Sequence, residues 1–300
     1  MSAKPIVVIG STNTDMVIRT EKFPSPGETL LGGKFFLFPG GKGANQAVAA
    51  SRLGGDVFFI TKLGNDIFGK QAIEQFKKEG LHTDYVRREA DLPSGVALIT
   101  VNAKGENTIV VAQGANGTLT EQDISRDALS IGEIFLLQLE IPLATVGFVA
   151  REMTAQGKRV IINPAPAAEL PSELLKGLYC ITPNQTEAGA LTGIAVNDAA
   201  TAAKAASKLY SLGVSNVVIT LGEAGAFLHN SETQKYLPGI KTDAVDTTAA
   251  GDVFCGALVV AIAEGMSMEQ SILFANKAAS ISVTRMGAQT SAPYRNEIKP

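Results

Sequence analysis

The chain has 300 residues, 45% of them hydrophobic and 18% charged, and a formal net charge of −3. This length and composition predict a globular protein that buries a large core as a single domain over 1–300. No run of Lys or Arg occurs, so we expect neither a nucleic acid nor a membrane surface as partner. The apolar run at residues 5–9 is too short for a signal peptide or a membrane span, which favours a cytoplasmic protein.

Short apolar runs alternate with helical patterns along the chain. Strands are predicted at 5–9, 57–61, 134–139, 159–162, 179–181 and 217–221, and helices at 44–53, 67–79, 142–156 and 199–212. This alternation predicts an α/β fold whose mostly parallel sheet is covered on both faces. Ligands of such a sheet bind at the carboxyl ends of its strands.

Two segments, about 14–38 and 95–112, break this alternation. Both are rich in Val, Ile, Phe and Thr, and the second contains a hairpin-like turn at 102–107. We expect antiparallel strands that form a lid, because a lid would exclude water from a phosphate-transfer site. Two ordinary surface hairpins are the alternative.

The segment DTTAAGD at 246–252 predicts a phosphate-transfer site. Ala249, Ala250 and Gly251 place no large side chain at the start of an apolar helix predicted at about 251–263, so their N–H groups can face an anion. Asp252 would then lie beside bound phosphate, where it can take a proton from an attacking hydroxyl. The alternative is that Asp252 only stabilises the helix N-terminus.

Two segments near the N-terminus are candidates for sugar binding. In GSTNTD at 10–15, the side chains of Asn13 and Asp15 project from the same face of an extended chain and can bind neighbouring hydroxyls. A βα turn held by these two side chains explains the pattern equally well. PGGKGANQA at 39–47 carries Lys42 and Asn45 at a helix start but lacks the spacing of a Walker loop. Its glycines allow close approach of the backbone to a polar ligand, or simply form a tight turn.

Two later segments are candidates for nucleotide and metal binding. In TPNQTE at 182–187, Asn184 and Glu187 would share one face of a helix, where their oxygens suit Mg²⁺ held largely through water. Capping of that helix by the same residues is the competing explanation. TLGEAG at 220–225 is a glycine-containing junction between a strand and a loop that could pass beneath a nucleotide.

Eight motifs occur in an order that resembles the ribokinase-like sugar kinases over nearly the whole chain. They are GSTNTD, GGKGANQA, QLE at 138–140, NPAPA at 163–167, TPNQTE, TLGEAG, DTTAAGD and VTRMGAQ at 283–289. The resemblance implies a three-layer α/β sandwich whose β-sheet lid also forms a homodimer interface. It implies ATP-dependent phosphorylation of D-ribose at the 5-hydroxyl, with Mg²⁺ at the phosphates and K⁺ as activator.

The resemblance also assigns site residues. Asp252 is the implied catalytic base, with Ala249, Ala250 and Gly251 as the anion hole. The implied sugar ligands, besides Asp252, are Asn13, Asp15, Gly41, Lys42, Asn45 and Glu140. The implied nucleotide site includes Asn184, Glu187 with the magnesium waters, Thr220, Gly222, Gly225, Gly251 and Asn276. The implied monovalent-cation site comprises Asp246, Thr248, Ser282, Arg285, Gly287 and Ser291.

Two positions depart from the family pattern: Val253 replaces a common Thr, and Cys255 replaces a common Asn. The general mechanism survives both changes, but they alter polar groups just inside the catalytic helix. The alternatives are therefore a kinase for 2-deoxyribose, another pentose or a nucleoside, and a sugar or nucleotide sensor without catalytic activity.

Overall fold

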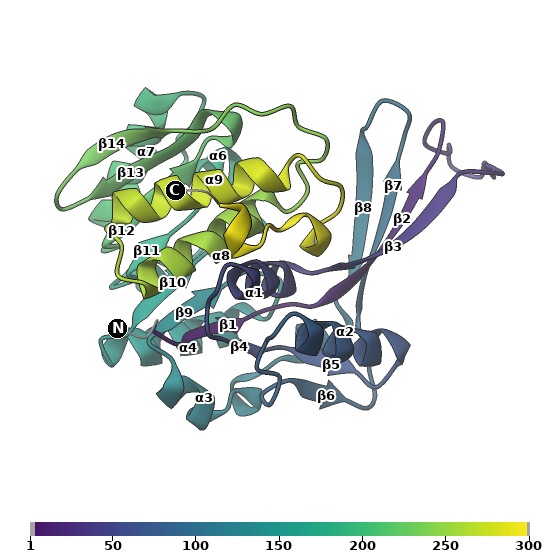
Figure 1. Cartoon of the computed structure of the whole chain (residues 1–300), viewed down its shortest axis with the longest axis horizontal. Coiled ribbons are helices and arrows are strands. Elements are labelled where there is room, and N and C mark those ends of the chain that lie inside the picture. Colours follow the sequence, from purple (N-terminus) through teal and green to yellow (C-terminus); the bar gives the residue numbers. More distant parts are fainter. Residues whose placement is uncertain (1–3, 299–300) are drawn as a thin grey trace.

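An eight-stranded sheet forms the centre of the computed structural model, which describes residues 4–298 (Figure 1). In sheet order its strands are β14 (Gln234–Pro238), β13 (Gly225–Asn230), β12 (Asn216–Thr220), β11 (Cys180–Ile181), β10 (Arg159–Ile162), β9 (Ile134–Leu137), β1 (Ile6–Ile9) and β4 (Val57–Ile60). The strands from β12 to β4 pair in parallel, and β13 and β14 add an antiparallel hairpin at one edge. The predicted α/β class and all six predicted core strands are confirmed.

Helices cover both faces of this sheet, because its strands are apolar on both sides. In β1, Ile6 and Val8 belong to one buried cluster and Val7 and Ile9 to the other. The first cluster includes residues of α1 (Lys42–Arg52), α2 (Ile67–Lys78), α8 (Ala250–Ala263) and α9 (Met268–Ser282). The second includes residues of α3 (Arg126–Ile131), α4 (Leu143–Ala155), α5 (Ser172–Leu175), α6 (Gln185–Thr192) and α7 (Ala199–Ser211).

A separate four-stranded sheet stands beside this body (Figure 1). Its order is β3 (Lys34–Gly40), β2 (Asn13–Arg19), β7 (Gly95–Val101) and β8 (Asn107–Ala112). The two segments expected to break the α/β pattern therefore join one sheet, which we call the lid sheet. The expectation of purely antiparallel strands is wrong, because β2 and β7 pair in parallel where the two segments meet.

Residues 20–33, between β2 and β3, contain no strand, although the whole segment 14–38 looked strand-like. Two prolines and three glycines interrupt the pattern, and Gly27, Gly32 and Gly33 have positive φ. A further small sheet, β5 (Lys62–Gly64) with β6 (Arg87–Glu89), was not predicted. Short 3₁₀ helices complete the fold: η1 (Gly114–Thr118), η2 (Glu121–Asp123), η3 (Gly222–Ala224), η4 (Gln289–Ser291) and η5 (Arg295–Glu297).

Over residues 4–298, none of the helices combines the length and apolar character needed to cross a lipid bilayer.

Candidate active site

Polar residues follow the central parallel strands of the main sheet. They meet where the carboxyl ends of these strands lie side by side, as the parallel arrangement predicts. A cavity of about 180 Å³ lies there, beside the start of α8. Its lining includes Lys42, Asn163, Thr182, Asn184, Glu187, Thr220, Thr247, Ala249, Ala250, Gly251, Asp252 and Cys255. The structure therefore brings together residues from five of the motifs that the sequence singled out.

Asp252 lies in the first turn of α8 and is only 6% exposed. Its Oδ2 accepts a hydrogen bond of 2.9 Å from Asn45 Nδ2, and its Oδ1 accepts one of 2.9 Å from Gln46 Nε2. Both donors belong to α1, which crosses α8 closely: a Cβ on Gly256 would lie 2.7 Å from the Gln46 carbonyl oxygen. The contact between these helices thus fixes the direction of the Asp252 carboxylate.

The Gln46 side chain is itself held by a buried network of amides. Its Oε1 accepts from Gln138 Nε2 at 2.6 Å, and its Nε2 also donates to Asn163 Oδ1 at 3.0 Å. Asn163 Nδ2 in turn donates to the Thr182 carbonyl at 3.0 Å, so Asn163 must present its oxygen to Gln46. Gln46, Gln138 and Asn163 belong to the motifs GGKGANQA, QLE and NPAPA, but no local pattern predicts that they support Asp252.

Four carboxylates, those of Asp15, Glu140, Glu187 and Asp252, interact with the single ammonium of Lys42. Burial raises the pKa of Asp252, while Lys42 and the amides of Asn45 and Gln46 act in the opposite direction. Burial, Glu140 and Asp252 together raise the pKa of Asp15 to about 7. Burial alone would lower the pKa of Lys42, but Asp252 and Glu140 raise it above its usual range. The site therefore concentrates negative charge around one fixed cation.

The predicted sugar ligands lie beside Asp252. Asn13 and Asp15 alternate along β2 and share one face, as expected. The carboxylate of Glu140 accepts hydrogen bonds from Ser11 Oγ at 2.5 Å and from the Lys42 backbone N–H at 3.0 Å. The turn at 10–15 connects two strands, so the alternative of a βα turn is wrong. The sequence did not single out Ser11.

Two glycines of the PGGKGANQA motif are required by backbone contacts. A Cβ on Gly41 would lie 2.6 Å from the Asn13 backbone nitrogen, and Gly41 has a φ of 88°. A Cβ on Gly43 would lie 2.6 Å from the Ser11 nitrogen. Their small size therefore lets the start of α1 approach residues 10–13, and this approach places Lys42 and Asn45 in the site.

The start of α8 offers backbone donors to an anion. Ala249 adopts a left-handed conformation with a φ of 60°, and the Ala250 N–H donates to the Thr247 carbonyl at 3.2 Å. The next two first-turn amides, those of Gly251 and Asp252, have no intrahelical acceptor by helix geometry. A Cβ on Gly251 would meet no atom within 4 Å, so open space lies beside this turn.

Comparison with known proteins identifies the family of this chain. A model described as pfkB family carbohydrate kinase matches residues 3–295. The chain belongs to the pfkB family of carbohydrate kinases. A ribokinase of Haemophilus influenzae is 44% identical, with 98% of this chain and 97% of the relative covered. A deoxyribokinase of Salmonella typhi is 38% identical, with 96% and 95% covered.

A solved structure of Arabidopsis thaliana ribokinase, complexed with ribose and ATP, is also similar to this chain. Its TM-score is 0.92 at 36% identity, and the match covers 98% of this chain and 97% of that one. The resemblance inferred from the motif order is therefore confirmed at the level of the family and of the fold.

In this carbohydrate kinase, Asn184 and Glu187 cap α6. Asn184 Oδ1 accepts from the Glu187 N–H at 2.8 Å, and Glu187 Oε2 accepts from the Asn184 N–H at 2.8 Å. The competing explanation of helix capping is thus realised. Both residues also line the cavity, so capping leaves their remaining lone pairs available to a ligand.

The other predicted nucleotide residues lie at the end of β12, in the turn after it and on α9. The Thr220 N–H donates to the Pro183 carbonyl at 2.9 Å, while Gly222 and Gly225 form a tight turn with φ values of 60° and 110°. Asn276, on α9, donates from Nδ2 to the Pro238 carbonyl at 3.1 Å. It therefore lies at the end of β14, and it is not among the residues that line the cavity at Asp252.

The predicted monovalent-cation residues lie in two segments that are held side by side: residues 246–248, and the stretch from the end of α9 to η4. The Asp246 carboxylate accepts from the N–H groups of Thr248 and Gly287, each at 2.9 Å. Ser282 and Ser291 donate to nearby carbonyls at 2.9 and 2.8 Å, and Arg285 pairs with Glu297. The side chains of these residues are thus engaged within the protein, and Gly287 has none.

In the part of the chain that the structure describes, no cluster of three or more His, Cys, Asp and Glu side chains is suited to a metal ion. Any cation at these loops would depend mainly on backbone carbonyls, which are ligands that K⁺ accepts. At the phosphates, the single carboxylate of Glu187 fits Mg²⁺, which commonly keeps several of its waters.

Proposed function

We propose that this carbohydrate kinase transfers the γ-phosphoryl group of ATP to the 5-hydroxyl of D-ribose. The similarity to ribokinases over almost the full chain supports this substrate pair, including one ribokinase solved with ribose and ATP. The observation that carries the proposal is the buried Asp252 carboxylate, oriented by two amides beside first-turn N–H groups. The use of ATP also supports the predicted cytoplasmic location.

Asp252 acts as the general base in this proposal. Because burial raises its pKa, the ionised carboxylate accepts a proton more readily than an exposed aspartate would. The hydrogen bonds from Asn45 and Gln46 leave lone pairs on both carboxylate oxygens. The carboxylate can thus accept the 5-hydroxyl proton while that oxygen attacks the phosphorus.

The sugar is held by the groups around Asp252. The proposed ligands are Asn13, Asp15, Gly41, Lys42, Asn45 and Glu140. Asn45 supports this role directly, since its Oδ1 is buried and has no hydrogen-bond partner, and the residue is only 7% exposed. A sugar hydroxyl would satisfy this oxygen, whose unpaired burial is otherwise unfavourable.

The phosphate side uses the start of α8. We assign the anion hole to Ala249, Ala250 and Gly251, where the helix dipole and the small side chains favour a negatively charged group. Lys42 lies near enough to be affected by the charges of both Asp252 and Glu187. Its ammonium therefore offsets charge that develops on the transferred group.

Two cations complete the proposal. Glu187 would hold Mg²⁺ through its water shell, and the loops of Asp246 and Gly287 would hold K⁺, with Thr248, Ser282, Arg285 and Ser291 near it. When bound, Mg²⁺ neutralises charge on the phosphates, and K⁺ steadies the backbone beside the anion hole. Asn184, Thr220, Gly222, Gly225 and Asn276 remain the proposed contacts of the nucleotide.

An Asp252→Asn variant tests the catalytic assignment. We expect turnover to fall by roughly 10²–10⁴-fold, because a general base contributes about that factor, while ATP affinity changes little. Turnover is measured by ADP release across a panel of sugars, and ATP affinity by calorimetry. Asp198→Asn is the matched control, since Asp198 caps α7 and accepts from the Thr201 N–H at 2.8 Å. Undiminished turnover in Asp252→Asn would refute the assignment.

A kinase for 2-deoxyribose is the second candidate, and the similarity to a deoxyribokinase favours considering it. Asn13 and Asp15 share one face and suit neighbouring hydroxyls, which favours ribose. Comparing kcat/KM for ribose and for 2-deoxyribose decides between the two sugars. A higher value for 2-deoxyribose would reassign the substrate within the same mechanism.

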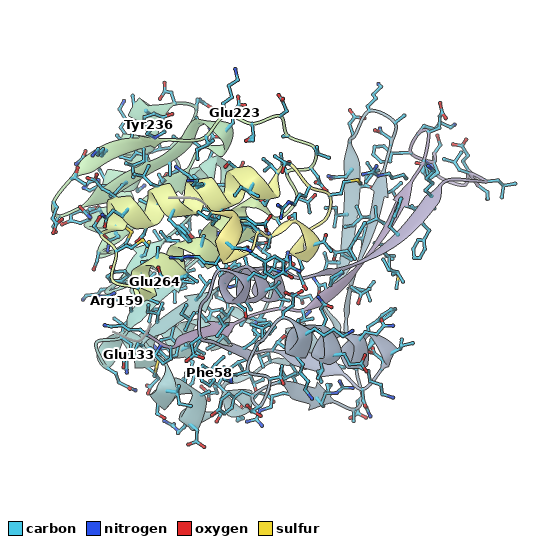
Figure 2. The ribbon with its side chains drawn as sticks, viewed as in Figure 1. Phe58, Glu133, Arg159, Glu223, Tyr236 and Glu264 are labelled. Carbon is cyan, nitrogen blue, oxygen red and sulfur yellow. The ribbon has the colours of Figure 1, made fainter. Side chains whose placement is uncertain are left out.

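We further propose that the chain forms a homodimer through the lid sheet, which acts as the lid of this single domain. Side chains project from both faces of this sheet (Figure 2). Phe35, Leu98 and Val110 are 60%, 56% and 68% exposed, and Ile109 on the other face is 53% exposed. So much exposed apolar surface is typical of an interface.

A further inference from the structure

One buried amide outside the proposed ligands controls the orientation of Asn13. Asn116 lies in η1, directly after the lid strand β8, and is only 1% exposed. Its Oδ1 accepts from the Thr12 backbone N–H at 2.9 Å, and its Nδ2 donates to the Thr12 carbonyl at 3.0 Å. These two backbone groups have fixed polarity, so they allow only one orientation of the Asn116 amide.

The remaining N–H of Asn116 fixes the next amide. Asn116 Nδ2 also donates to Asn13 Oδ1 at 2.8 Å, and an amide nitrogen requires an acceptor there. Asn13 must therefore point its oxygen at Asn116 and keep its NH₂ group for a ligand. A Cβ on Gly95 would lie 2.2 Å from Asn13 Oδ1 and 2.3 Å from Asn116 Nδ2, so this glycine packs closely against the amide pair.

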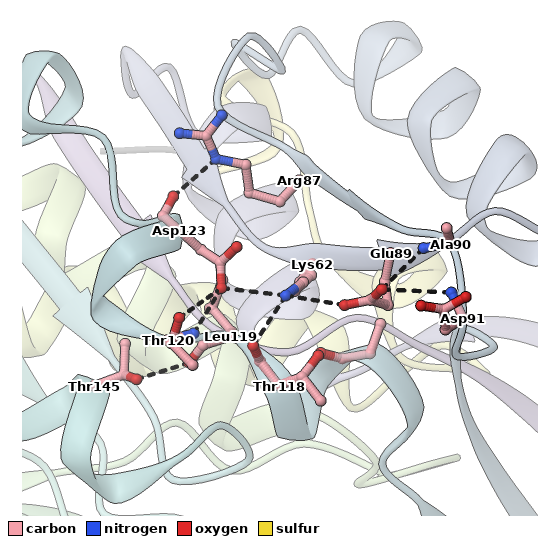
Figure 3. Close-up of polar contacts among 11 residues, drawn as sticks. Lys62, Arg87, Glu89, Ala90, Asp91, Thr118, Leu119, Thr120, Asp123 and Thr145 are labelled. Carbon is pink, nitrogen blue, oxygen red and sulfur yellow. Dashed lines mark hydrogen bonds and ion pairs between the residues drawn. The ribbon is translucent and has the colours of Figure 1, made fainter.

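The segment that carries Asn116 is anchored at its far end by Lys62 (Figure 3). Lys62 Nζ donates to the Thr118 carbonyl at 3.0 Å and pairs with Asp123 at 3.2 Å and Glu89 at 3.1 Å. The Lys62 side chain is 11% exposed. The amide of Asn116 is thus held by Thr12 on one side, and its helix is held by β5 on the other.

We propose that Asn116 is a positioning residue that determines specificity: it makes Asn13 present an N–H donor, and no acceptor, to the sugar. The inference rests on the proposed function, in which Asn13 is a sugar ligand. On the same face of β2, Asp15 supplies an acceptor when ionised. Asn13 and Asp15 therefore select a sugar with two neighbouring hydroxyls. One hydroxyl donates its proton to Asp15, and the oxygen of the other accepts from the Asn13 N–H.

An Asn116→Asp variant reverses this polarity with almost no change of shape. The new carboxylate still accepts from the Thr12 N–H. Its other oxygen loses the hydrogen bond to the Thr12 carbonyl and forces Asn13 to turn and donate to it. Asn13 then presents its oxygen beside Asp15, so two acceptors compete for the hydroxyl protons. We expect the KM for ribose to rise about tenfold or more, with kcat and the KM for ATP changed less than about threefold.

A double-mutant cycle separates positioning from a general loss of structure. Once Asn13→Ala has removed the oriented group, Asn116→Asp should raise the ribose KM less than about twofold further. Asn216→Asp is the matched control, because Asn216 Nδ2 donates to the Tyr179 carbonyl at 2.9 Å and its Oδ1 accepts from Asn230 at 3.0 Å. It places a similar buried charge in β12, and the ribose KM should stay at the wild-type value.

Each outcome has a defined meaning. If the two KM effects multiply in the double variant, or if Asn216→Asp raises the ribose KM equally, the inference is wrong and the proposed sugar site stands. If Asn13→Ala keeps the wild-type ribose KM, both the inference and the proposed role of Asn13 in the sugar site are wrong. If Asn116→Asp does not fold, Asn13→Asp makes the same exchange of donor for acceptor, and a wild-type ribose KM in that variant would overturn the inference.

Discussion

Asp252 shows how a single buried carboxylate is oriented by its neighbours, as its proposed role in proton transfer requires. Each of its oxygens accepts one hydrogen bond from a side-chain amide, and both amides come from α1. Amide donors fix the direction of a carboxylate without supplying a full positive charge, so they restrain it while leaving it basic. Lys42 adds a cation that opposes the effect of burial on the pKa of Asp252.

A Gln46→Leu variant tests the role of these amides. The Gln46 hydrogen bond lowers the pKa of Asp252 against the effect of burial, so its loss should raise that pKa. The acidic limb of the pH profile of kcat/KM should then move to higher pH. We expect activity to fall roughly tenfold at pH 6 and clearly less at pH 9. A uniform reduction at every pH would mean that Gln46 acts only on structure.

Asp15 illustrates the cost of assembling a charged site. Its pKa is raised to about 7 by burial and by Glu140 and Asp252. An unfolded Asp15 loses its proton near pH 4, so between about pH 4 and 7 the folded chain binds more protons than the unfolded chain. The free energy of unfolding therefore falls as pH rises through this range. Above about pH 7 Asp15 is ionised in the folded chain, and its destabilising effect is complete.

An Asp15→Asn variant should therefore be more stable than the wild type at pH 8. We expect its Tm to rise by a few degrees at pH 8 and by less at pH 5, because Asp15 in the folded chain already holds its proton there. Scanning calorimetry without ligand measures this difference. The ribose KM should rise in the same variant, since an amide replaces the acceptor. An equal change of Tm at both pH values would contradict the assigned pKa.

At the scale of elements, α6 carries one pair of residues whose capping role is compatible with their proposed role in ligand binding. Asn184 and Glu187 form a reciprocal capping box, and both face the cavity. The two explanations weighed from sequence therefore do not exclude each other. Capping uses one oxygen of each side chain, and the other groups remain free to meet a nucleotide or its metal.

A Glu187→Gln variant separates these two roles. Its Oε1 can still accept from the Asn184 N–H, so we expect the Tm to change by less than about 1 °C, whereas Glu187→Ala should lose roughly 1 kcal/mol of stability. Only the charge is lost in Glu187→Gln. The Mg²⁺ concentration needed for half-maximal activity should rise severalfold, as measured by titration. An unchanged Mg²⁺ requirement would leave capping as the sole role of Glu187.

At the scale of the molecule, the lid sheet leaves the body as a sheet with few helices to cover it (Figure 1). Every residue of β8 is exposed, in contrast with the buried strands of the central sheet. A sheet with apolar side chains on both faces needs another surface to pack against. A second copy of the chain would supply that surface, and it would steady the strand that carries Asn13 and Asp15.

Light scattering tests the dimer. We expect the wild type to show twice the monomer mass at micromolar concentration. Val110→Asp and Val111→Asp place a charge on opposite faces of β8, and at least one should give the monomer mass, because a buried unpaired charge is strongly unfavourable. Glu106→Asp, in the turn before β8, is the control. A wild type with the monomer mass would disprove the dimer.

The sequence was informative where local chemistry decides the structure. Apolar runs gave the core strands, and Asp252, Asn184 and Gly41 were recognised because a helix start or a turn requires such residues nearby in the chain. The hairpin of β13 and β14 was missed, as was the parallel pairing of β2 with β7. Strand pairing depends on which segments meet in space, and alternation along one strand does not report its partner.

The sequence by itself determined the α/β class, the family and the positions of the motifs, because these follow from periodicity and from motif order. Only the tertiary structure decided which polar groups face one another. The amides of Gln46 and Asn116 act on Asp252 and Asn13 across 206 and 103 positions. Hydrogen-bond direction depends on distances and orientations that arise only after helices and strands have packed.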